Sequence, residues 1–589
     1  MKNSYSLLLF LLSCIPFGSF ASTTWKLQNV EYRVDTLSHV VIGPGTTQTT
    51  LMLEGPVKLR VFYTTTDMTD PNVNLKLIMG KDNLTSNVTV PNMPASHNDP
   101  ENIYFAGVNA DFIGGMGPVG TTAANGEMYK SYKGTGWYAI GIDKDKKLHS
   151  GAPYTTFKLV SPNAGQASIK AVNAVRSDNE MILYTSRKGS TTGTKGAGVE
   201  VGAVAVDGPL KSEGTTRMRV TVAPVKDVGN MAIPENGFVL SGTGFTTNTL
   251  TKMQLGEEFE VTPTIYFDNV ATTDITDMCG GCPMLLQEGK ILETQGSLDH
   301  LVNREPRTAI GYNTDGTKVI LLVVDGRQPG VSVGVPSKDL AAILLNLGCT
   351  EALNFDGGGS STLYVKELGV INTPSEGSLR AVKNGLFITT PATTDKEIAQ
   401  IRFADYAKKA EQNSYYSPVI YGYNAQGLLI DTNVKGITLS CSTELGEVQE
   451  NGTTVLCSGT GTHPLTASLG ELTTTLLVTV NGSGTGIAST ATGSIDVYPN
   501  PARTGDQVYI DFNGSGTVCI YSTTGRLIHR FEYKKNGNTP TVLPTESLTS
   551  GFYIITLSDK TFNRIAKFCL LYTSPSPRDY AASRMPSSA

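Results

Sequence analysis

The chain has 589 residues, of which 39% are hydrophobic and 17% are charged, and its formal net charge is −5. This length favours several domains over a single core. A mildly acidic chain with mixed charges excludes a protein that binds nucleic acid through electrostatics, and no segment beyond the N-terminal apolar run is long and apolar enough to cross a bilayer as a helix.

The N-terminus has the pattern of an export signal. Lys2 precedes an apolar run over residues 7–20, and the residues up to Ala21 resemble a small-x-small cleavage site. Residues 1–21 are therefore predicted to be a secretory signal peptide. Cys14 leaves lipidation open as the alternative, although the apolar run continues beyond it. In residues 22–95 apolar and polar positions alternate in short runs, and this pattern predicts a β-rich N-terminal lobe.

Two predicted strands in the middle of the chain each end at an aspartate. Residues 318–324 (KVILLVV) form an apolar, β-branched run that fits a buried strand, and Asp325 follows directly. A second strand is predicted over residues 351–355, and Asp356 follows it. A carboxylate at a strand end is a candidate for binding or catalysis, although an aspartate before glycine also occurs in ordinary turns.

The segment between these strands predicts a helix. Ser337 is the expected N-cap, apolar residues recur at helical spacing, and Gly348 is the expected C′ glycine. A strand, helix and strand in this order predict parallel strands with a right-handed crossover. Both aspartates would then leave the same edge of the sheet, where open α/β sheets bind ligands. We therefore expect an α/β (mixed α+β) catalytic domain over residues 96–392.

The residues after Asp356 are suited to hold an anion. Gly357, Gly358 and Gly359 leave the backbone amides open to a ligand, and Ser360 and Ser361 add hydroxyl donors. A plain tight turn is the alternative.

Two arginines flank the first of the two strands. Arg307 and Arg327 stand on either side of residues 318–324, and the planar guanidinium group binds phosphate oxygens in pairs. Both arginines could instead be paired to the neighbouring acids.

The histidines favour carboxylate chemistry by exclusion. The chain has six, and none lies in a glycine-rich or strand-terminal motif. No H-E-x-x-H signature occurs. A distant histidine that folds into the site stays possible, with His97 and His300 nearest to motif-like sequence.

The block from Arg307 to Val365 resembles the signature of the phosphodiester glycosidases, the family related to the lysosomal uncovering enzyme that acts on N-acetylglucosamine-1-phosphodiesters. Further segments fit the same pattern, and together they span about residues 100–390. The sequence Asn109-Ala110-Asp111-Phe112 departs from it, because the family more often has Asn-Gly-x-Phe there. The other matching segments include 118–120, 172–176, 183–185, 233–241, 280–285, Asn372, Pro374 and Arg380.

The resemblance implies a secreted hydrolase that cleaves the glycosidic bond of a sugar-1-phosphodiester and releases the sugar and a phosphomonoester. Asp325 and Asp356 are the leading catalytic candidates, with Asp111 and Glu200 in reserve. No cofactor is expected, and metal dependence stays open. The alternatives are a non-catalytic protein that binds surface glycans and a phosphodiesterase that cleaves the P–O bond. The expected substrate-binding residues are Asn109, Arg307, Thr308, Arg327, Gly357, Gly358, Gly359, Ser360 and Ser361.

The C-terminal third reads as small modules. Residues 393–480 contain short predicted strands, similar to bacterial Ig-like domains, and residues 481–494 have the composition of a flexible linker. Residues 495–570 resemble the type A sorting domain of the type IX secretion system. This resemblance implies a source among the Bacteroidetes, export across the outer membrane and contact with the secretion machinery. Residues 571–589 have no structural pattern and are excluded as a non-native tail.

The cysteines allow several interpretations. Cys279 and Cys282 form a C-x-x-C motif, for which a local disulfide or a glycine turn is favoured over a redox pair or half of a zinc site. Cys441 and Cys457 lie in one β-rich segment and could pair in an oxidising compartment.

Overall fold

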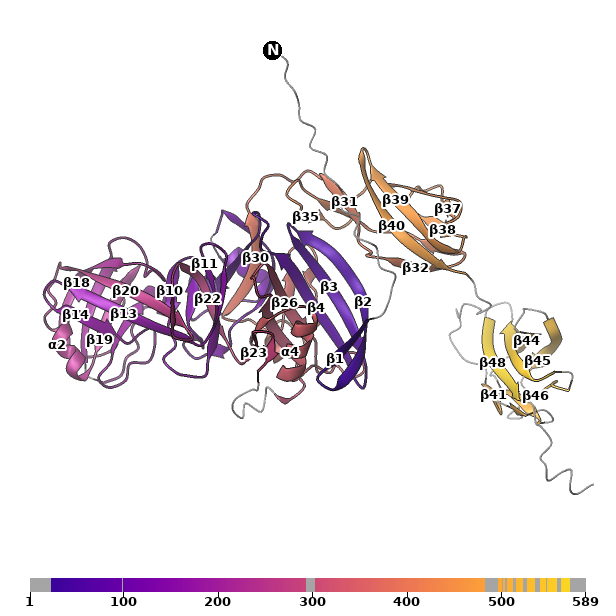
Figure 1. Cartoon of the computed structure of the whole chain (residues 1–589), viewed down its shortest axis with the longest axis horizontal. Coiled ribbons are helices and arrows are strands. Elements are labelled where there is room, and N and C mark those ends of the chain that lie inside the picture. Colours follow the sequence, from indigo (N-terminus) through magenta and orange to yellow (C-terminus); the bar gives the residue numbers. More distant parts are fainter. Residues whose placement is uncertain are drawn as a thin grey trace, which may run out of the picture. The chain divides into compact units, whose positions relative to one another are not determined.

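The computed structural model describes residues 23–482, except 98, 197 and 293–301, and the residues from 496 to 571 apart from seven short gaps. The predicted signal peptide, linker residues 483–494 and tail residues 572–589 lie outside the described residues. The chain divides into two compact units, and Figure 1 labels many of its helices and strands. The first comprises Met1–Ala407, Ser417–Ser440 and Thr466–Leu476, and the second comprises Lys408–Tyr416, Cys441–Leu465 and Leu477–Ala589.

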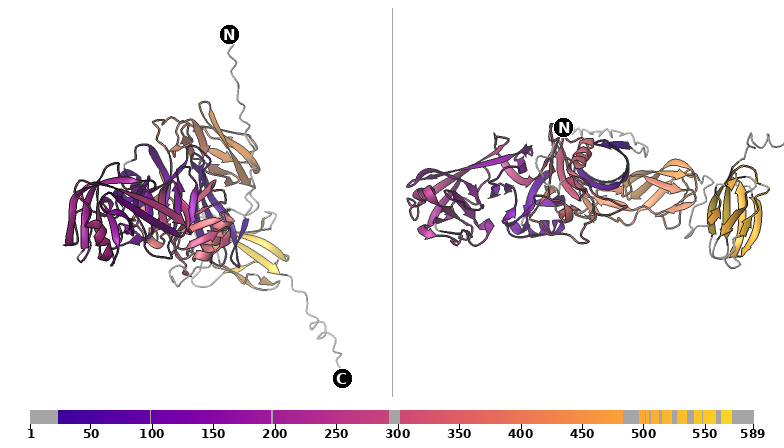
Figure 2. Two further views of the ribbon diagram at one scale, coloured as in Figure 1. Left: turned by 60° about the vertical axis from the view of Figure 1, so that its left-hand side comes forward. Right: turned by 90° about the horizontal axis from the view of Figure 1, so that it is seen from below.

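A nine-stranded sheet forms the centre of the first unit, and every pairing within it is antiparallel. Its N-terminal strands form a curved wall in the right-hand view of Figure 2. The segment expected to be a separate N-terminal lobe thus supplies four strands of the central sheet. The strand order is β1 (Thr23–Leu27), β2 (Val30–Gly43), β3 (Thr46–Glu54), β4 (Lys58–Asp67), β26 (Lys318–Val324), β25 (Arg307–Tyr312), β27 (Glu351–Asn354), β23 (Met284–Gln287) and β24 (Lys290–Ile291).

Strand β26 is apolar at almost every position because both of its faces are covered. Val319, Leu321 and Val323 belong to one core cluster, and Ile320 and Leu322 belong to another. The second cluster includes Leu340, Ile343 and Leu344 of helix α4 (Ser337–Asn346).

A five-stranded sheet shares the first core cluster with β26. Leu77, Val108 and Leu386 of this sheet belong to that cluster together with Leu321. The two sheets therefore pack face to face, as in a sandwich. The order of the second sheet is β29 (Gly369–Val370), β28 (Leu363–Val365), β6 (Asn102–Asn109), β30 (Asn384–Pro391) and β5 (Asn74–Met79).

Two further sheets of the first unit share a separate core cluster. One has the order β10 (Glu127–Lys130), β9 (Thr122–Ala124), β22 (Ile275–Gly281), β11 (Tyr138–Asp143) and β12 (Leu148–Gly151). The other has the order β14 (Gly165–Ile169), β13 (Pro153–Ser161), β20 (Glu258–Phe267), β18 (Thr216–Val228), β17 (Gly198–Ala205), β19 (Gly237–Gly242), β16 (Met181–Thr185) and β15 (Ala171–Val172), with β21 (Val270–Thr272) beside β20.

The α/β expectation for the catalytic domain is wrong, because the described residues form a β-rich fold. The α-helices in the described part are α1 (Met93–Ser96), α2 (Thr247–Leu250) and α4. Strands β26 and β27 run in the same direction, but β25 lies between them and is antiparallel to both. Burial on both faces gave β26 the continuous apolar run that is typical of parallel sheets, although its neighbours are antiparallel.

Helix α4 itself was predicted well, with one error at its start. The helix begins at Ser337, so the N-cap is Pro336. Gly348 follows the C-cap with a φ of 87°, a left-handed conformation that glycine adopts without strain.

The C-terminal segments are entirely β where the structure describes them. In the first unit, β31 (Gln400–Phe403), β34 (Ile420–Tyr423) and β35 (Leu429–Asp431) form a small sheet. In the second unit, β33 (Ser414–Tyr416), β38 (Val455–Cys457) and β37 (Glu447–Val448) form another. The Ig-like boundaries at 393 and 480 stay a prediction. Cys441 and Cys457 are free thiols.

The last part of the second unit consists of two sheets around one core cluster. Within the described residues of the chain, no helix is long and apolar enough to cross a membrane. The first sheet has the order β41 (Asp496–Tyr498), β43 (Val508–Asp511) and β46 (Thr541–Leu543). The second has the order β42 (Ala502–Arg503), β48 (Asn563–Leu571), β47 (Gly551–Ser558), β44 (Ser515–Ser522) and β45 (Leu527–Lys534).

Two neighbouring leucines of α4 test whether this helix stabilises the first unit through its buried face. Leu344 is 0% exposed and Leu345 is 40% exposed. Leu344→Ala should lower the free energy of unfolding by about 2–5 kcal/mol, because it leaves a cavity in the core, whereas Leu345→Ala should change it by less than about 1 kcal/mol. Urea unfolding followed by tryptophan fluorescence measures both. Equal losses in the two variants would contradict the described packing of α4.

Candidate active site

The structure places Asp325 and Asp356 at the same end of the central sheet. Asp325 directly follows β26, and Asp356 comes two residues after β27. On the intervening strand β25, Arg307 pairs with Val324, and the carbonyl of Thr308 accepts a hydrogen bond from the amide of Phe355 at 2.9 Å. The backbones that carry the two acids are therefore two strand spacings apart, about 10 Å.

Asp325 is a buried carboxylate with few hydrogen-bond donors. It is 1% exposed, and its oxygens accept bonds from the amide of Thr373 at 3.1 and 3.2 Å and from Nδ2 of Asn372 at 3.3 Å. Burial raises its pKa to about 6, and these bonds together with the nearby charge of Arg60 oppose the rise. The Nε of Arg60 is itself buried without a hydrogen-bond partner.

Asp356 is fixed by the glycine-rich turn that follows it. Its Oδ1 accepts a bond from the amide of Gly357 at 2.9 Å, and its Oδ2 accepts one from Oγ of Ser360 at 2.7 Å. Asn372, which contacts Asp325, also donates from Nδ2 to the carbonyl of Ser361 at 3.1 Å. One asparagine thus contacts both Asp325 and the turn that follows Asp356.

Two partly exposed arginines lie against this turn, each paired with a glutamate. Nε of Arg327 donates to Glu305 at 2.6 Å, and Arg380 forms an ion pair with Glu376. Nη1 of Arg380 also lies 3.4 Å from Oγ of Ser360.

The glycines are needed for this close approach. A Cβ added at Gly358 would lie 3.2 Å from Nη2 of Arg327, and one at Gly359 would lie 2.4 Å from Nη2 of Arg380. Gly358 also has a φ of 60°. The second distance is far below normal van der Waals contact, so a larger residue at Gly359 would displace the Arg380 side chain.

The side chain of Arg307 is buried and bonds to backbone carbonyls. It is almost completely buried, and its guanidinium group donates to the carbonyls of Val335 and Asn303 at 3.1 and 3.0 Å. Burial lowers its pKa to about 10. These contacts fix the segments on either side of β25 and β26, and the proposed role of Arg307 in substrate binding stays a prediction.

Asn109 and Thr308 tie the second sheet to the aspartate turn. Asn109 is completely buried at the end of β6, and its Nδ2 donates to the carbonyl of Asp356 at 2.6 Å. Its Oδ1 accepts bonds from Oγ1 of Thr308 at 2.8 Å and from the amide of Thr362 at 3.0 Å. These bonds set the position of the turn, because they connect β6, β25 and the residues after Asp356.

The reserve candidate Asp111 is next to the site but is occupied by its own loop. The preceding carbonyl, of Ala110, accepts a bond from the amide of Asp356 at 2.9 Å. The carboxylate of Asp111 accepts bonds from the amides of Phe112 and Gly120 at 2.8 and 2.7 Å and from Trp137 at 3.2 Å. Burial raises its pKa to about 6. This geometry fits a residue that organises the loop.

The structure does not bring Glu200 to the contacts that join Asp325 and Asp356. Glu200 lies in β17 of another sheet and is completely buried. Its carboxylate accepts bonds from the hydroxyl groups of Thr192, Thr194 and Ser241 and from the amide of Met231. Arg176 lies 3.8 Å away as its ion-pair partner.

Several residues of the site were not among the predicted site residues. Asn372 and Arg380 fit the family pattern in the sequence, but no local signal there connects them with Asp325 or Ser360. Arg60 and Glu305 carry no recognisable signal, because each reaches the site only through the pairing of distant segments. The residues added by the structure are Arg60, Glu305, Asn372, Thr373, Glu376 and Arg380.

The C-x-x-C motif borders the segment that carries Asp356, because the carbonyl of Cys282 accepts a bond from Nδ2 of Asn354 at 2.7 Å. Cys279 in β22 and Cys282 are buried free thiols, and burial raises the pKa of Cys282 to about 11. Across the described residues, no group of three or more His, Cys, Asp or Glu side chains is placed to hold a metal ion.

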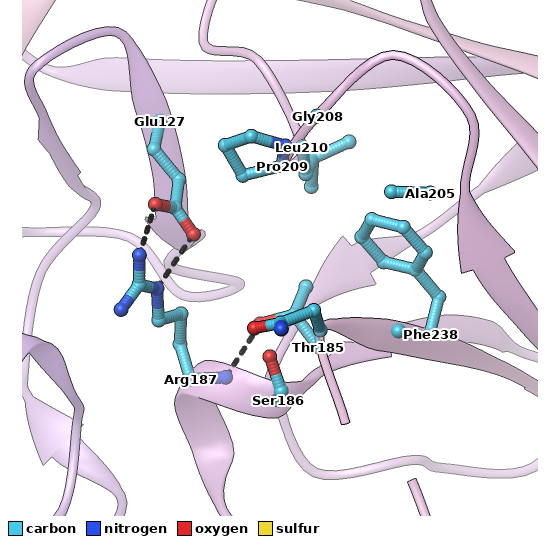
Figure 3. A pocket seen from close by; sticks show the side chains of 11 residues that line it. Glu127, Thr185, Ser186, Arg187, Ala205, Gly208, Pro209, Leu210 and Phe238 are labelled. Carbon is cyan, nitrogen blue, oxygen red and sulfur yellow. Dashed lines mark hydrogen bonds and ion pairs between the residues drawn. The ribbon is translucent and has the colours of Figure 1, made fainter. Parts of the chain in front are cut away.

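A cavity of about 300 Å³ lies elsewhere in the first unit (Figure 3). Arg187 lines it but is held there by Glu127 at 2.7 and 2.8 Å, and its third nitrogen donates to the carbonyl of Asp82. Thr185, Pro209 and Phe238 form other parts of the wall. A guanidinium group engaged on all sides is a structural element, so the strand-end aspartates remain the better candidate for chemistry.

The raised pKa of Asp325 predicts a pH dependence of stability. Its pKa in the folded protein is about 6 against an ordinary value of 3.8, so the folded state binds this proton more tightly. The contribution of this bound proton to the free energy of unfolding is fully present below pH 4 and is lost as the pH rises through 6. It amounts to at most about 3 kcal/mol. Urea unfolding measures the free energy of unfolding of the wild-type protein and of Asp325→Asn at pH 4 and pH 7.5. From pH 4 to pH 7.5, the wild-type protein should lose stability relative to the variant. A constant difference would mean that the pKa is not raised.

Comparison with known proteins identifies two regions of the chain. Residues 204–389 match the phosphodiester glycosidase family, and residues 496–570 match the secretion system C-terminal sorting domain. The first match contains Asp325 and Asp356 but begins after Asn109, Asp111 and Glu200. The SPbeta prophage-derived uncharacterized protein YomE of Bacillus subtilis is 44% identical over 88 residues, which are 15% of this chain and 13% of that protein.

Two solved structures resemble part of the fold at low identity. A hypothetical protein from Synechocystis has a TM-score of 0.46 and 17% identity, over 59% of this chain and 62% of that one. The catalytic domain of zebrafish N-acetylglucosamine-1-phosphodiester α-N-acetylglucosaminidase, auto-inhibited by its pro-peptide, has a TM-score of 0.32 and 15% identity, over 60% of this chain and 87% of that one. From the two sequence matches, the chain contains a phosphodiester glycosidase domain and a secretion system C-terminal sorting domain.

Proposed function

We propose that this protein is an exported hydrolase that cleaves the glycosidic bond of a sugar-1-phosphodiester, with N-acetylglucosamine as the sugar. The observation that supports it most is the pair of strand-end aspartates beside a glycine turn flanked by two arginines, with Asn372 bonded both to Asp325 and to that turn. The phosphodiester glycosidase match covers both acids. Carboxylate pairs are the usual machinery of glycoside hydrolysis.

The phosphate group would bind over the glycine turn. The guanidinium groups of Arg327 and Arg380 lie beside Gly358 and Gly359, where no Cβ keeps a ligand from the backbone. A phosphodiester could replace the carboxylates of Glu305 and Glu376 as their partner, because the guanidinium fork fits two oxygens of either group. The hydroxyl group of Ser361, which is buried without a hydrogen-bond partner, is available nearby.

The two aspartates would divide the chemistry according to their surroundings. With a pKa of about 6, Asp325 suits proton transfer near neutral pH, and we assign it the removal of a proton from the attacking water. Asp356, held by Gly357 and Ser360, would stabilise positive charge on the sugar ring. The water oxygen bonds to C1, the bond from C1 to the phosphate oxygen breaks, and the phosphomonoester leaves with that electron pair. A phosphate leaving group needs little protonation.

The C-terminal sorting domain indicates export and a secreted or surface location. We propose type IX secretion in a member of the Bacteroidetes, with residues 1–21 as the signal peptide and the secretion machinery as the partner of residues 496–570. The patterns in these two terminal segments support this route.

Substitution of the two aspartates tests the catalytic assignment. Asp325→Asn and Asp356→Asn should each lower kcat on the methyl diester of N-acetylglucosamine 1-phosphate by about 100-fold or more, because each removes a charge or a proton acceptor from the reaction. Glu200→Gln is the matched control, since it changes a buried carboxylate of another sheet, and it should keep near-normal kcat. A loss in the control together with normal turnover in both asparagine variants would overturn the assignment.

The fate of the water oxygen separates this reaction from the alternatives. In ¹⁸O-labelled water the label should appear on C1 of the released sugar. Label on the phosphate would identify a phosphodiesterase, and the absence of any turnover by the wild-type protein would favour a glycan-binding protein.

A further inference from the structure

The largest cavity among those described in the first unit is lined by residues that no step of the proposed reaction uses. It has a volume of about 490 Å³ and lies between β13, β14, the start of β16 and the α2 region. This size is within the range of small-molecule sites. None of the residues that contact Asp325 or Asp356 lines it, so the cavity is separate from the aspartate site.

Two aromatic rings at this cavity are unusually exposed. Phe245 is 70% exposed and Tyr154 is 56% exposed. The ring of Tyr154 lies 5.8 Å from that of Tyr266, which limits its freedom to turn. Large exposed aromatic side chains that gather at one hollow typically mark a binding surface, because a ligand can cover their apolar faces.

The charged side chains of the lining are one acid, Glu180, and one base, Lys170, so its formal charges balance. The carboxylate of Glu180 forms an ion pair with Lys133 and accepts a bond from the amide of Ser177 at 3.0 Å. The amide side chain of Asn179 and the hydroxyl group of Thr249 also line the cavity. A hollow with two aromatic faces, an amide and hydroxyl groups suits a neutral ligand that has both apolar faces and hydroxyl groups.

We propose that this cavity is a second carbohydrate site, which binds neutral sugar units of an oligosaccharide or polymer. This inference rests on the proposed function for the substrate class: the aspartate site would cleave the sugar-1-phosphodiester while this cavity holds other sugar units of the same glycan. The rings of Phe245 and Tyr154 stack on sugar faces, and Asn179 and Thr249 bond to hydroxyl groups. The enzyme then acts on glycan chains in preference to small diesters.

Binding to a neutral oligosaccharide tests the site without any turnover. Isothermal titration of the full chain carrying Asp356→Asn with a β-1,4-linked hexamer of N-acetylglucosamine should show binding. Adding Phe245→Ala and Tyr154→Ala should weaken that binding at least 10-fold. Tyr415→Ala, which truncates a 68% exposed tyrosine outside this cavity, should leave it unchanged.

Hydrolysis of the methyl diester keeps the two proposals distinguishable. The Phe245→Ala and Tyr154→Ala protein should hydrolyse it at the wild-type rate, because no residue that lines the cavity bonds to Asp325 or Asp356. If the hexamer fails to bind, or binds equally well after the two truncations, the second site is wrong even when hydrolysis is normal. If the wild-type protein does not hydrolyse the methyl diester, this result contradicts the proposed function but not the second site.

Discussion

The pairing of β25 with both β26 and β27 is the constraint on which the candidate site depends. This strand sets the register of the two neighbours that end at Asp325 and Asp356. A shift of one residue would turn every side chain of a strand to the opposite face, and burial of β26 between two cores makes such a shift costly. The two acids therefore stay at one edge because the hydrophobic cores on both faces fix the ladder.

The same burial that fixes the sheet also changes the chemistry of its edge. Asp325 ends a strand that is covered on both faces, so its carboxylate loses water and its pKa rises to about 6. A buried charge would be expensive without compensation, and the amide of Thr373, Asn372 and the charge of Arg60 supply it in part. Asp356 differs because it stands on the turn and accepts two local hydrogen bonds. Two identical side chains thus acquire different properties from their surroundings.

Charge on the outer side of the turn is balanced by pairs that can exchange partners. Arg327 and Arg380 are partly exposed and are matched by Glu305 and Glu376, and pairs of this kind contribute little to stability in water. A phosphate group that presents two oxygens to the guanidinium group can replace such a carboxylate at a low cost in free energy. Arg307 has the opposite character, since its guanidinium group is buried and bonded to backbone carbonyls. The two exposed arginines are therefore better suited to a transient anion than the buried one.

Local sequence alone determined the strand Lys318–Val324 and the helix that ends before Gly348, because each depends on short-range periodicity or on a turn residue. The common edge of the two acids was expected from a pair of parallel neighbours, and in the structure it depends instead on β25. The tertiary structure decided that β25 lies between the two strands and that the fold is β-rich. It also brought Asn109 to the carbonyl of Asp356, although 247 residues separate them. Contacts of this kind arise from the pairing of distant segments, for which no local pattern in the chain carries a signal.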